Sequence, residues 1–172
     1  SALSFQKEDG RFVSLSDSGA SHLHPFLYTC EGLLFVGEKF GKQKYIDAAR
    51  RGVEWALSNA VRNNKVNYFY ADGFNEFERG DALGQLLRLS CYFSQNNLLP
   101  QESKEKVSFL AQHLSEYQKE GERQAGGFYY GYHDSGEKLN NINSWCTMFA
   151  VQALAFYQDL QSEKKIDISY LI

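Results

Sequence analysis

The chain lacks any apolar run long enough to cross a membrane, and it lacks an excess of basic residues. A membrane-spanning helix needs about 20 consecutive apolar residues, and a nucleic-acid surface needs clustered Lys and Arg. The formal net charge is instead −3, with both signs mixed along the chain. We therefore expect neither a membrane nor a nucleic acid as a partner.

Paired cysteines are also missing. Cys30, Cys91 and Cys146 all fall in apolar segments, and their number and spacing argue against a disulfide framework or a zinc knuckle. Buried free thiols are the expected state, which fits a reducing compartment such as the cytoplasm. His22 and His24 are spaced like a metal pair, but no third ligand is near in sequence, so we expect no metal and no cofactor.

What the chain does have is apolar and aromatic material for one sizeable core. It contains 172 residues, of which 43% are hydrophobic, so we expect a single folded domain. The aromatic share is 15%, and many of these residues fall in loops. Aromatic loops either pack between helices or form a surface on which sugar rings stack.

Hydrophobic periodicity predicts five helices. The expected ranges are 26–40, 42–60, 82–94, 101–118 and 145–157. The first, third and fifth are apolar nearly all round, whereas the second and fourth each have a charged face. Buried helices of this kind face the centre of a fold and amphipathic ones face solvent.

A loop pattern repeats between these helices. Residues 3–12 and 114–128 both read as the last turn of a helix, a glycine stop and a Gly-aromatic segment. Gly73-Phe74 is a looser third copy. The pattern predicts stacked helical hairpins with a repeat of roughly 55–65 residues. The alternative is an irregular five-helix bundle.

Residues 6–12, 118–128 and 143–154 resemble the α/α toroid proteins. This superfamily includes six-hairpin glycosidases, sugar 2-epimerases, polysaccharide lyases, terpenoid cyclases and protein prenyltransferase β subunits. The resemblance implies an all-α fold in which helical hairpins form an arc of a toroid, joined by long glycine-aromatic loops. The terpenoid and prenyl branches fit less well, because the Asp-rich acid motif and the Asp-x-Cys zinc pair are absent.

Complete toroids carry about six hairpins, so residues 1–172 are expected to be one α-helical domain from the C-terminal part of a larger toroid. Residues 3–12 resemble the last turn of a helix and the loop that follows it, but the rest of that helix is absent from the chain. An open end would leave Leu27, Leu34 and Phe35 partly exposed, at about 25 cal/mol per Å² of apolar surface. We expect missing upstream hairpins or a homodimer partner to cover them.

The resemblance places a ligand site at the N-terminal ends of the inner helices. Unpaired backbone N–H groups and a positive dipole end favour a polar ligand there. The residues at these ends are types that bind sugars: carboxylates, amides, an indole and phenols. The substrate-binding candidates are His22, His24, Tyr28, Arg79, Tyr130, Asn143 and Trp145.

The catalytic candidates are Asp81, Glu31 and Glu76, since a pair of carboxylates performs acid/base work on glycosidic bonds. Each has a structural alternative. Glu31 could be buried as an ion pair with Arg88, Asp81 could cap its helix, and the two histidines could be a cap and a hydrogen-bonded core residue.

The sequence therefore predicts a carbohydrate-active domain of saccharide hydrolase, lyase or epimerase type. The alternative is a non-catalytic helical scaffold that binds a glycan or a protein, and a cyclase or prenyltransferase is the third choice. The carboxylates decide between the first two. Ion-paired or capping carboxylates would remove the acid/base pair, whereas two carboxylates facing one cavity would favour an enzyme.

Overall fold

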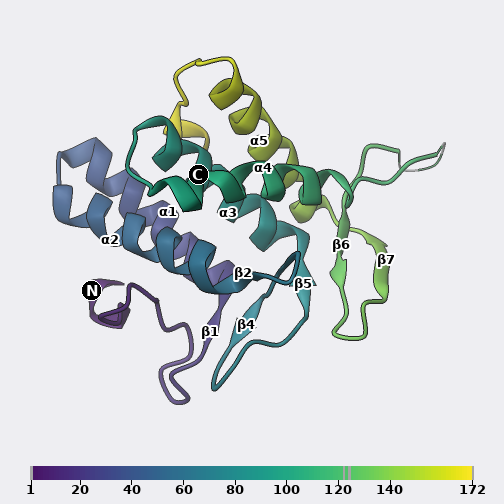
Figure 1. Cartoon of the computed structure of the whole chain (residues 1–172), viewed down its shortest axis with the longest axis horizontal. Coiled ribbons are helices and arrows are strands. Elements are labelled where there is room, and N and C mark those ends of the chain that lie inside the picture. Colours follow the sequence, from purple (N-terminus) through teal and green to yellow (C-terminus); the bar gives the residue numbers. More distant parts are fainter. Residues whose placement is uncertain (1, 122, 124, 172) are drawn as a thin grey trace.

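The computed structural model describes residues 2–121, 123 and 125–171, and within these ranges five α-helices carry most of the fold (Figure 1). The helices are α1 (Leu23–Phe40), α2 (Gln43–Trp55), α3 (Gly80–Gln95), α4 (Gln101–Ser115) and α5 (Ser144–Gln161). A turn of π-helix, Ala56–Ala60, continues α2, and 3-10 helices lie at Ala2–Phe5 and Ile168–Leu171. The five predicted helices are confirmed, with shifted ends. In the described part of the chain, none is long and apolar enough to cross a membrane.

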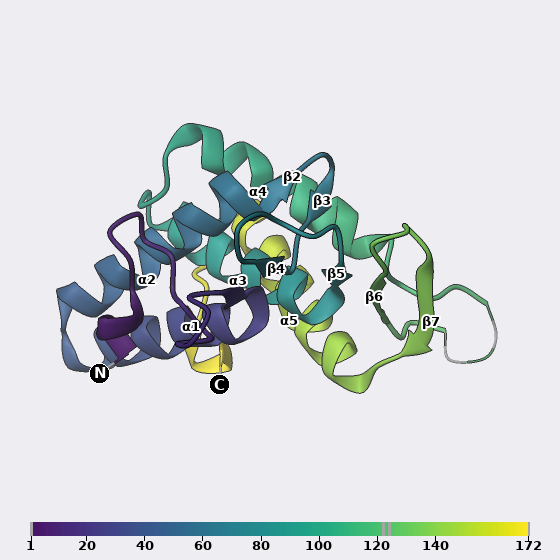
Figure 2. The same ribbon diagram turned by 90° about the horizontal axis from the view of Figure 1, so that it is seen from below.

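The helices form two layers, with α1, α3 and α5 in the inner layer and α2 and α4 in the outer one (Figures 1 and 2). α3 is the centre, because every residue from Gly80 to Ser94 is buried and α1, α4 and α5 all pack on it. The outer helices are amphipathic. α2, for example, buries Ala49 and Val53 and exposes Asp47. The expected burial of an inner helix on nearly all sides is confirmed for α3 but is wrong for α1 and α5, because each of them leaves apolar side chains exposed on one side.

The prediction of an all-α fold is wrong, because the loops between the helices pair into β-structure. Seven short strands form three antiparallel sheets among the described residues. They are β1 (Ser21–His22), β2 (Val61–Arg62), β3 (Lys65–Val66), β4 (Phe69–Tyr70), β5 (Glu78–Arg79), β6 (Tyr129–Tyr132) and β7 (Lys138–Ile142). The sheets run β1–β4, β2–β3 and β5–β6–β7. The aromatic loops carry backbone N–H and C=O groups that no helix satisfies, and strand pairing satisfies them.

The strands fix where the inner helices begin. β1 runs directly into α1, β5 directly into α3, and β7 reaches α5 through one residue, Asn143. The three-stranded sheet ties the start of α3 to the start of α5, with Arg79 opposite Gly131. A Cβ atom on Gly131 would lie 1.9 Å from the carbonyl oxygen of Glu78, so only glycine allows this approach. The starts of α3 and α5 are thus held together by main-chain contacts.

The repeated loop pattern is a structural repeat. An isolated β-bridge joins Gln6 to Phe12, and the same bridge joins Gln118 to Phe128. Three backbone hydrogen bonds also recur, each from a residue of 6–13 and its counterpart in 118–129. They are Gln6 to Leu3 and Gln118 to Ser115, Lys7 to Arg11 and Lys119 to Gly127, and Val13 to Phe5 and Tyr129 to Tyr117. Phe74 differs, since it bridges to Tyr70 in its own loop.

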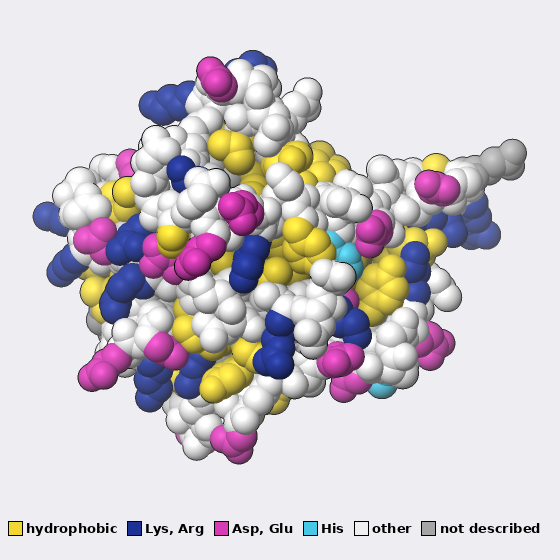
Figure 3. Space-filling view, in the orientation of Figure 1, with side chains coloured by type: hydrophobic (Ala, Val, Ile, Leu, Met, Phe, Trp, Pro, Cys, Tyr) yellow, Lys and Arg dark blue, Asp and Glu magenta, His cyan; other side chains and the backbone are white. Residues whose placement is uncertain are grey.

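The core holds the three cysteines as buried free thiols, as predicted. Leu27 and Leu34 are fully buried too, so the prediction that an open end leaves them partly exposed is wrong, whereas Phe35 is partly exposed as predicted. Other positions of the inner layer carry exposed apolar side chains. These form an α1 stripe of Tyr28, Val36 and Phe40 and an α5 stripe of Trp145, Met148 and Val151. In Figure 3, charged side chains of both signs are spread over α2 and α4, and hydrophobic side chains reach the surface beside α5.

Candidate functional site

The strand–helix junctions at the starts of α1, α3 and α5 bring most of the predicted site residues into contact. Arg79 and Asp81 form the charged centre of this region. The Nε of Arg79 donates to Oδ1 of Asp81 at 3.0 Å, and Nη2 donates to Oδ2. The backbone N–H of Ala82 donates to the same Oδ1 at 2.7 Å, in the first turn of α3 where the helix dipole favours an anion. The Asp81 side chain is 1% exposed, and the positive charge of Arg79 compensates its buried negative charge.

Two aromatic rings lie close to the Arg79 guanidinium. Its carbon lies 4.8 Å from the ring centre of Tyr68 and 5.0 Å from that of Tyr130. Nη1 also donates to the Tyr68 hydroxyl at 2.9 Å. His22 stacks on Tyr68 with ring centres 5.3 Å apart. Tyr130 comes from β6, so the β5–β6 pairing is what delivers it to this arginine.

His24 connects the charged centre to the interior. Its Nδ1 lies 2.6 Å from Oε1 of Gln85 and 3.6 Å from Oδ2 of Asp81. Gln85 Oε1 is an acceptor, so Nδ1 carries the proton and Nε2 is left as an acceptor. Burial lowers the pKa of His24, against the opposing charge of Asp81. Burial and the Arg79 charge lower the pKa of His22. Both imidazoles are therefore neutral at pH 7.

A buried ion pair lies beneath His24. Gln85 Nε2 donates to Oε2 of Glu31 at 3.1 Å, and Nη2 of Arg88 donates to Oε1 of the same carboxylate. Arg88 also donates to Gln152 of α5 and lies 4.5 Å from the ring centre of Phe149. Glu31 and Arg88 are 1% and 0% exposed. Burial raises the pKa of Glu31, against the charge of Arg88. The interpretation of Glu31 as one half of an ion pair with Arg88 is confirmed.

An exposed aromatic patch, formed by Tyr28 and Trp145, covers this network. Tyr28 is 40% and Trp145 50% exposed, and they come from α1 and α5. Each ring meets the buried Phe149 at right angles or nearly so, with centres 5.9 Å apart. His24 approaches Tyr28 edge-on at 4.7 Å. The patch is therefore an exposed aromatic surface, supported from below by Phe149 and bordered by a neutral imidazole.

Two predicted residues make different contacts. Glu76 lies in the exposed loop before β5, where its carboxylate accepts from Lys65 at 2.7 Å, and it makes none of the contacts described above. Asn143 is the N-cap of α5, and its Oδ1 accepts from the backbone N–H of Cys146 at 3.0 Å. The structure thus brings together His22, His24, Tyr28, Glu31, Arg79, Asp81, Tyr130 and Trp145.

Three members of the region were not predicted from the sequence: Tyr68, Gln85 and Gln152. A signal existed for Gln85, because an uncharged amide between Leu83 and Leu86 in an apolar helix must find a buried partner. Tyr68 and Gln152 gave no such signal. Tyr68 belongs to a loop rich in similar rings, and Gln152 lies on a helix whose solvent side was unknown.

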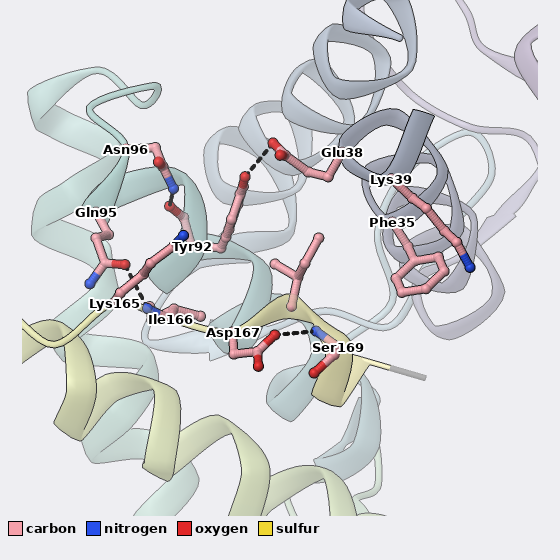
Figure 4. A pocket seen from close by; sticks show the side chains of 11 residues that line it. Phe35, Glu38, Lys39, Tyr92, Gln95, Asn96, Lys165, Ile166, Asp167 and Ser169 are labelled. Atoms are coloured by element: carbon pink, nitrogen blue, oxygen red, sulfur yellow. Dashed lines mark hydrogen bonds between the residues drawn. The ribbon is translucent and has the colours of Figure 1, made fainter. Parts of the chain in front are cut away.

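A cavity of about 680 Å³ lies elsewhere, between the C-terminal halves of α1 and α3 and residues 165–169 (Figure 4). The Tyr92 hydroxyl donates to Glu38 on its wall, and Gln95 Oε1 accepts from the backbone N–H of Ile166 at 2.8 Å. The second bond fixes the C-terminal segment against α3. No predicted site residue lines this cavity.

Comparison with known proteins gives one line of support for the fold. No family model matches the chain, and no curated protein matches it. Among solved structures, it is similar to a novel alpha-amylase from Clostridium perfringens, with a TM-score of 0.65 and 11% sequence identity. The similarity covers 96% of this chain and 48% of that one, so the chain spans about half the length of its structural neighbour. At this identity the likeness shows a shared fold alone.

Proposed function

We propose that this chain is a saccharide-binding domain whose ligand lies on the aromatic patch at the starts of α1 and α5. The exposed pair of Tyr28 and Trp145 carries the proposal. Large exposed rings are costly to leave in water and provide flat apolar faces on which sugar rings stack. The neutral imidazole of His24 borders the patch and offers Nε2 to a hydroxyl group. The fold shared with an alpha-amylase is consistent with a carbohydrate ligand.

Binding is favoured over two-carboxylate catalysis because all three candidate carboxylates are ion-paired. Asp81 pairs with Arg79, Glu31 with Arg88 and Glu76 with Lys65. Asp81 and Glu31 are also closed to solvent. A glycosidase needs one carboxylic acid and one carboxylate that both reach the scissile bond. Asp81, Glu31 and Glu76 offer no such pair.

The experiment is a glycan-array screen followed by calorimetric titration of the best ligands. Trp145→Ala and Tyr28→Ala should each weaken binding strongly. We expect about 30-fold for Trp145, the size of a typical loss at a central binding residue. Phe40→Ala is the matched control, because Phe40 is also an exposed aromatic of α1, at the opposite end of the helix. If no glycan binds, or if Phe40→Ala has the same effect, the proposal is wrong.

A second candidate is a saccharide-converting enzyme of hydrolase, lyase or epimerase type. His24 favours it, since its imidazole is neutral at pH 7, uses Nδ1 for Gln85 and borders Tyr28 of the patch, so that Nε2 could act as a general base. The test is to incubate the chain with the glycans that bind and to follow products by chromatography. Turnover that disappears in His24→Gln while glycan binding is retained would establish an enzyme, and absence of turnover leaves the binding domain.

A further inference from the structure

The charges around the aromatic patch cancel. Four charged groups act on the polar side chains of the region: Arg79, Asp81, Glu31 and Arg88. They form two cation–anion pairs, and in each pair the carboxylate is 1% exposed. A ligand on the patch therefore meets no unpaired charge among these groups.

The remaining polar groups are uncharged. They are the imidazoles of His22 and His24 and the phenols of Tyr28, Tyr68 and Tyr130. Burial raises the pKa of both Tyr28 and Tyr68, so these hydroxyls stay protonated. Such groups both donate and accept hydrogen bonds, which matches the hydroxyl groups of a sugar.

The charge of Arg79 is already paired. Three of its five N–H groups are used, two by Asp81 and one by the Tyr68 hydroxyl. The ring centres of Tyr68 and Tyr130 lie 4.8 and 5.0 Å from the carbon of its guanidinium. A carboxylate or sulfate on a sugar would compete with Asp81 for this cation, and any loss of the Arg79–Asp81 pair leaves the buried Asp81 carboxylate without its partner. An unpaired buried charge is strongly unfavourable.

We infer that the ligand of the aromatic patch is an uncharged saccharide, neither a uronic acid nor a free amino sugar. This inference rests on the proposed function and narrows its substrate class. An amino sugar is disfavoured because the negative charge of Asp81 is also paired. The Asp81 carboxylate already accepts from Arg79 and from the backbone N–H of Ala82, so it is not available to bind an ammonium group of the ligand.

The test uses oligosaccharides matched in backbone and different in charge. One pair is galacturonic acid oligomers and their methyl esters, and the other is chitosan oligomers and their N-acetylated forms. We expect the uncharged member of any pair that binds to bind at least about tenfold more tightly. Its Kd should stay constant between about 0.05 and 0.5 M salt, because no charge is attracted.

The same titrations at lower pH add a second readout. His24 is faced by Asp81, Gln85 and Arg88 of α3, by Arg79 of β5, by Tyr28 of α1 and by Phe149 of α5. Protonating His24 removes the acceptor at Nε2, so neutral-sugar binding should weaken as the pH falls below the ordinary histidine pKa of 6.5. His24→Gln should remove this pH dependence.

The outcomes separate the two proposals. Tighter binding of a charged member, or a Kd that rises with salt, overturns the inference and leaves the saccharide-binding domain intact. Failure of every oligosaccharide to bind overturns both. Trp145→Ala, which should weaken binding of the preferred member about 30-fold, shows that the titrations report on this patch.

Discussion

The guanidinium of Arg88 on α3 and the carboxylate of Glu31 on α1 form an ion pair that is closed to solvent. Gln85 donates to Glu31 and Gln152 accepts from Arg88, so the pair connects all three helices of the inner layer. A buried pair of this kind costs desolvation energy, and its strength depends on both partners being present.

Removing one partner should therefore destabilise the fold strongly. We expect Glu31→Leu or Arg88→Met alone to lower the free energy of unfolding by about 3–5 kcal/mol, because each leaves an uncompensated buried charge. The double variant Glu31→Leu/Arg88→Met should recover most of this loss. Urea unfolding followed by circular dichroism measures all three. Additive losses in the double variant would contradict the pairing.

The contact between α3 and α5 predicts the effect of two glycine substitutions. A Cβ atom on Gly84 would lie 3.1 Å from backbone and side-chain atoms of Phe149. Gly84→Ala should therefore cost about 1–3 kcal/mol, as expected for overpacking. Gly32 on α1 is the control, since a Cβ there meets nothing within 4 Å. Gly32→Ala should stabilise the helix by about 0.5–1 kcal/mol. Thermal unfolding distinguishes the two, and equal effects would argue against this close packing.

His113 on α4 predicts a pH dependence of stability. Its Nε2 lies 2.8 Å from a buried carboxylate oxygen of Glu78, and Nδ1 lies 3.2 Å from Glu116. Burial lowers the pKa of His113, but the hydrogen bonds and charges of Glu78 and Glu116 raise it more, so its pKa in the folded state lies above 6.5. The stabilisation is complete below the unfolded-state pKa and is lost as the pH rises through the folded-state pKa.

The measurement compares wild type with His113→Gln from about pH 5.5 to 9. The difference in their free energies of unfolding should be largest at the acid end and shrink as the pH rises. The comparison cancels the opposite contributions of His22 and His24, whose pKa values are lowered in the folded state. A difference that grows with pH would show that His113 is not held as a cation.

Met148 and Val151, the part of the α5 stripe outside the aromatic patch, predict association. Val151 and Met148 are 56% and 40% exposed at helical spacing on α5, which is unusual for a helix that faces only water. We expect the chain to self-associate in sedimentation experiments, and Val151→Lys to shift it toward the monomer. Gln101→Lys, on the exposed start of α4, is the control. A monomer that binds a hydrophobic dye would instead favour cover by further hairpins of a longer protein. A monomer that binds no dye would contradict both self-association and cover by further hairpins.

The helices were predictable because their apolar spacing is local information. The repeated helix ends and loops at residues 3–12 and 114–128 were predictable for the same reason, since the same residue types recur at similar spacing. The strands were not. β5 has only two residues, and its partner β6 lies about fifty positions away, so the pairing depends on how the helices bring the loops together.

The site was predictable only as a location. The N-terminal ends of the inner helices do converge, and the Glu31–Arg88 alternative came from the need to pair a buried carboxylate. The pairing of Arg79 with Asp81 was not foreseen. These residues are two apart, and only an extended residue followed directly by a helix start lets them meet. Glu76 was misleading because sequence alone does not say which way a loop carboxylate points.

The burial of α3 on all sides determines how the molecule exchanges its amide protons. Every residue from Gly80 to Ser94 is buried, with helices of both layers around it. No local opening exposes these amides without separating α1, α4 or α5 from α3. Their exchange with heavy water should therefore require global unfolding and give the slowest rates in the chain, and the free energy obtained from those rates should equal that from urea unfolding. Amides of α2, which has one face in water, should exchange faster through smaller openings.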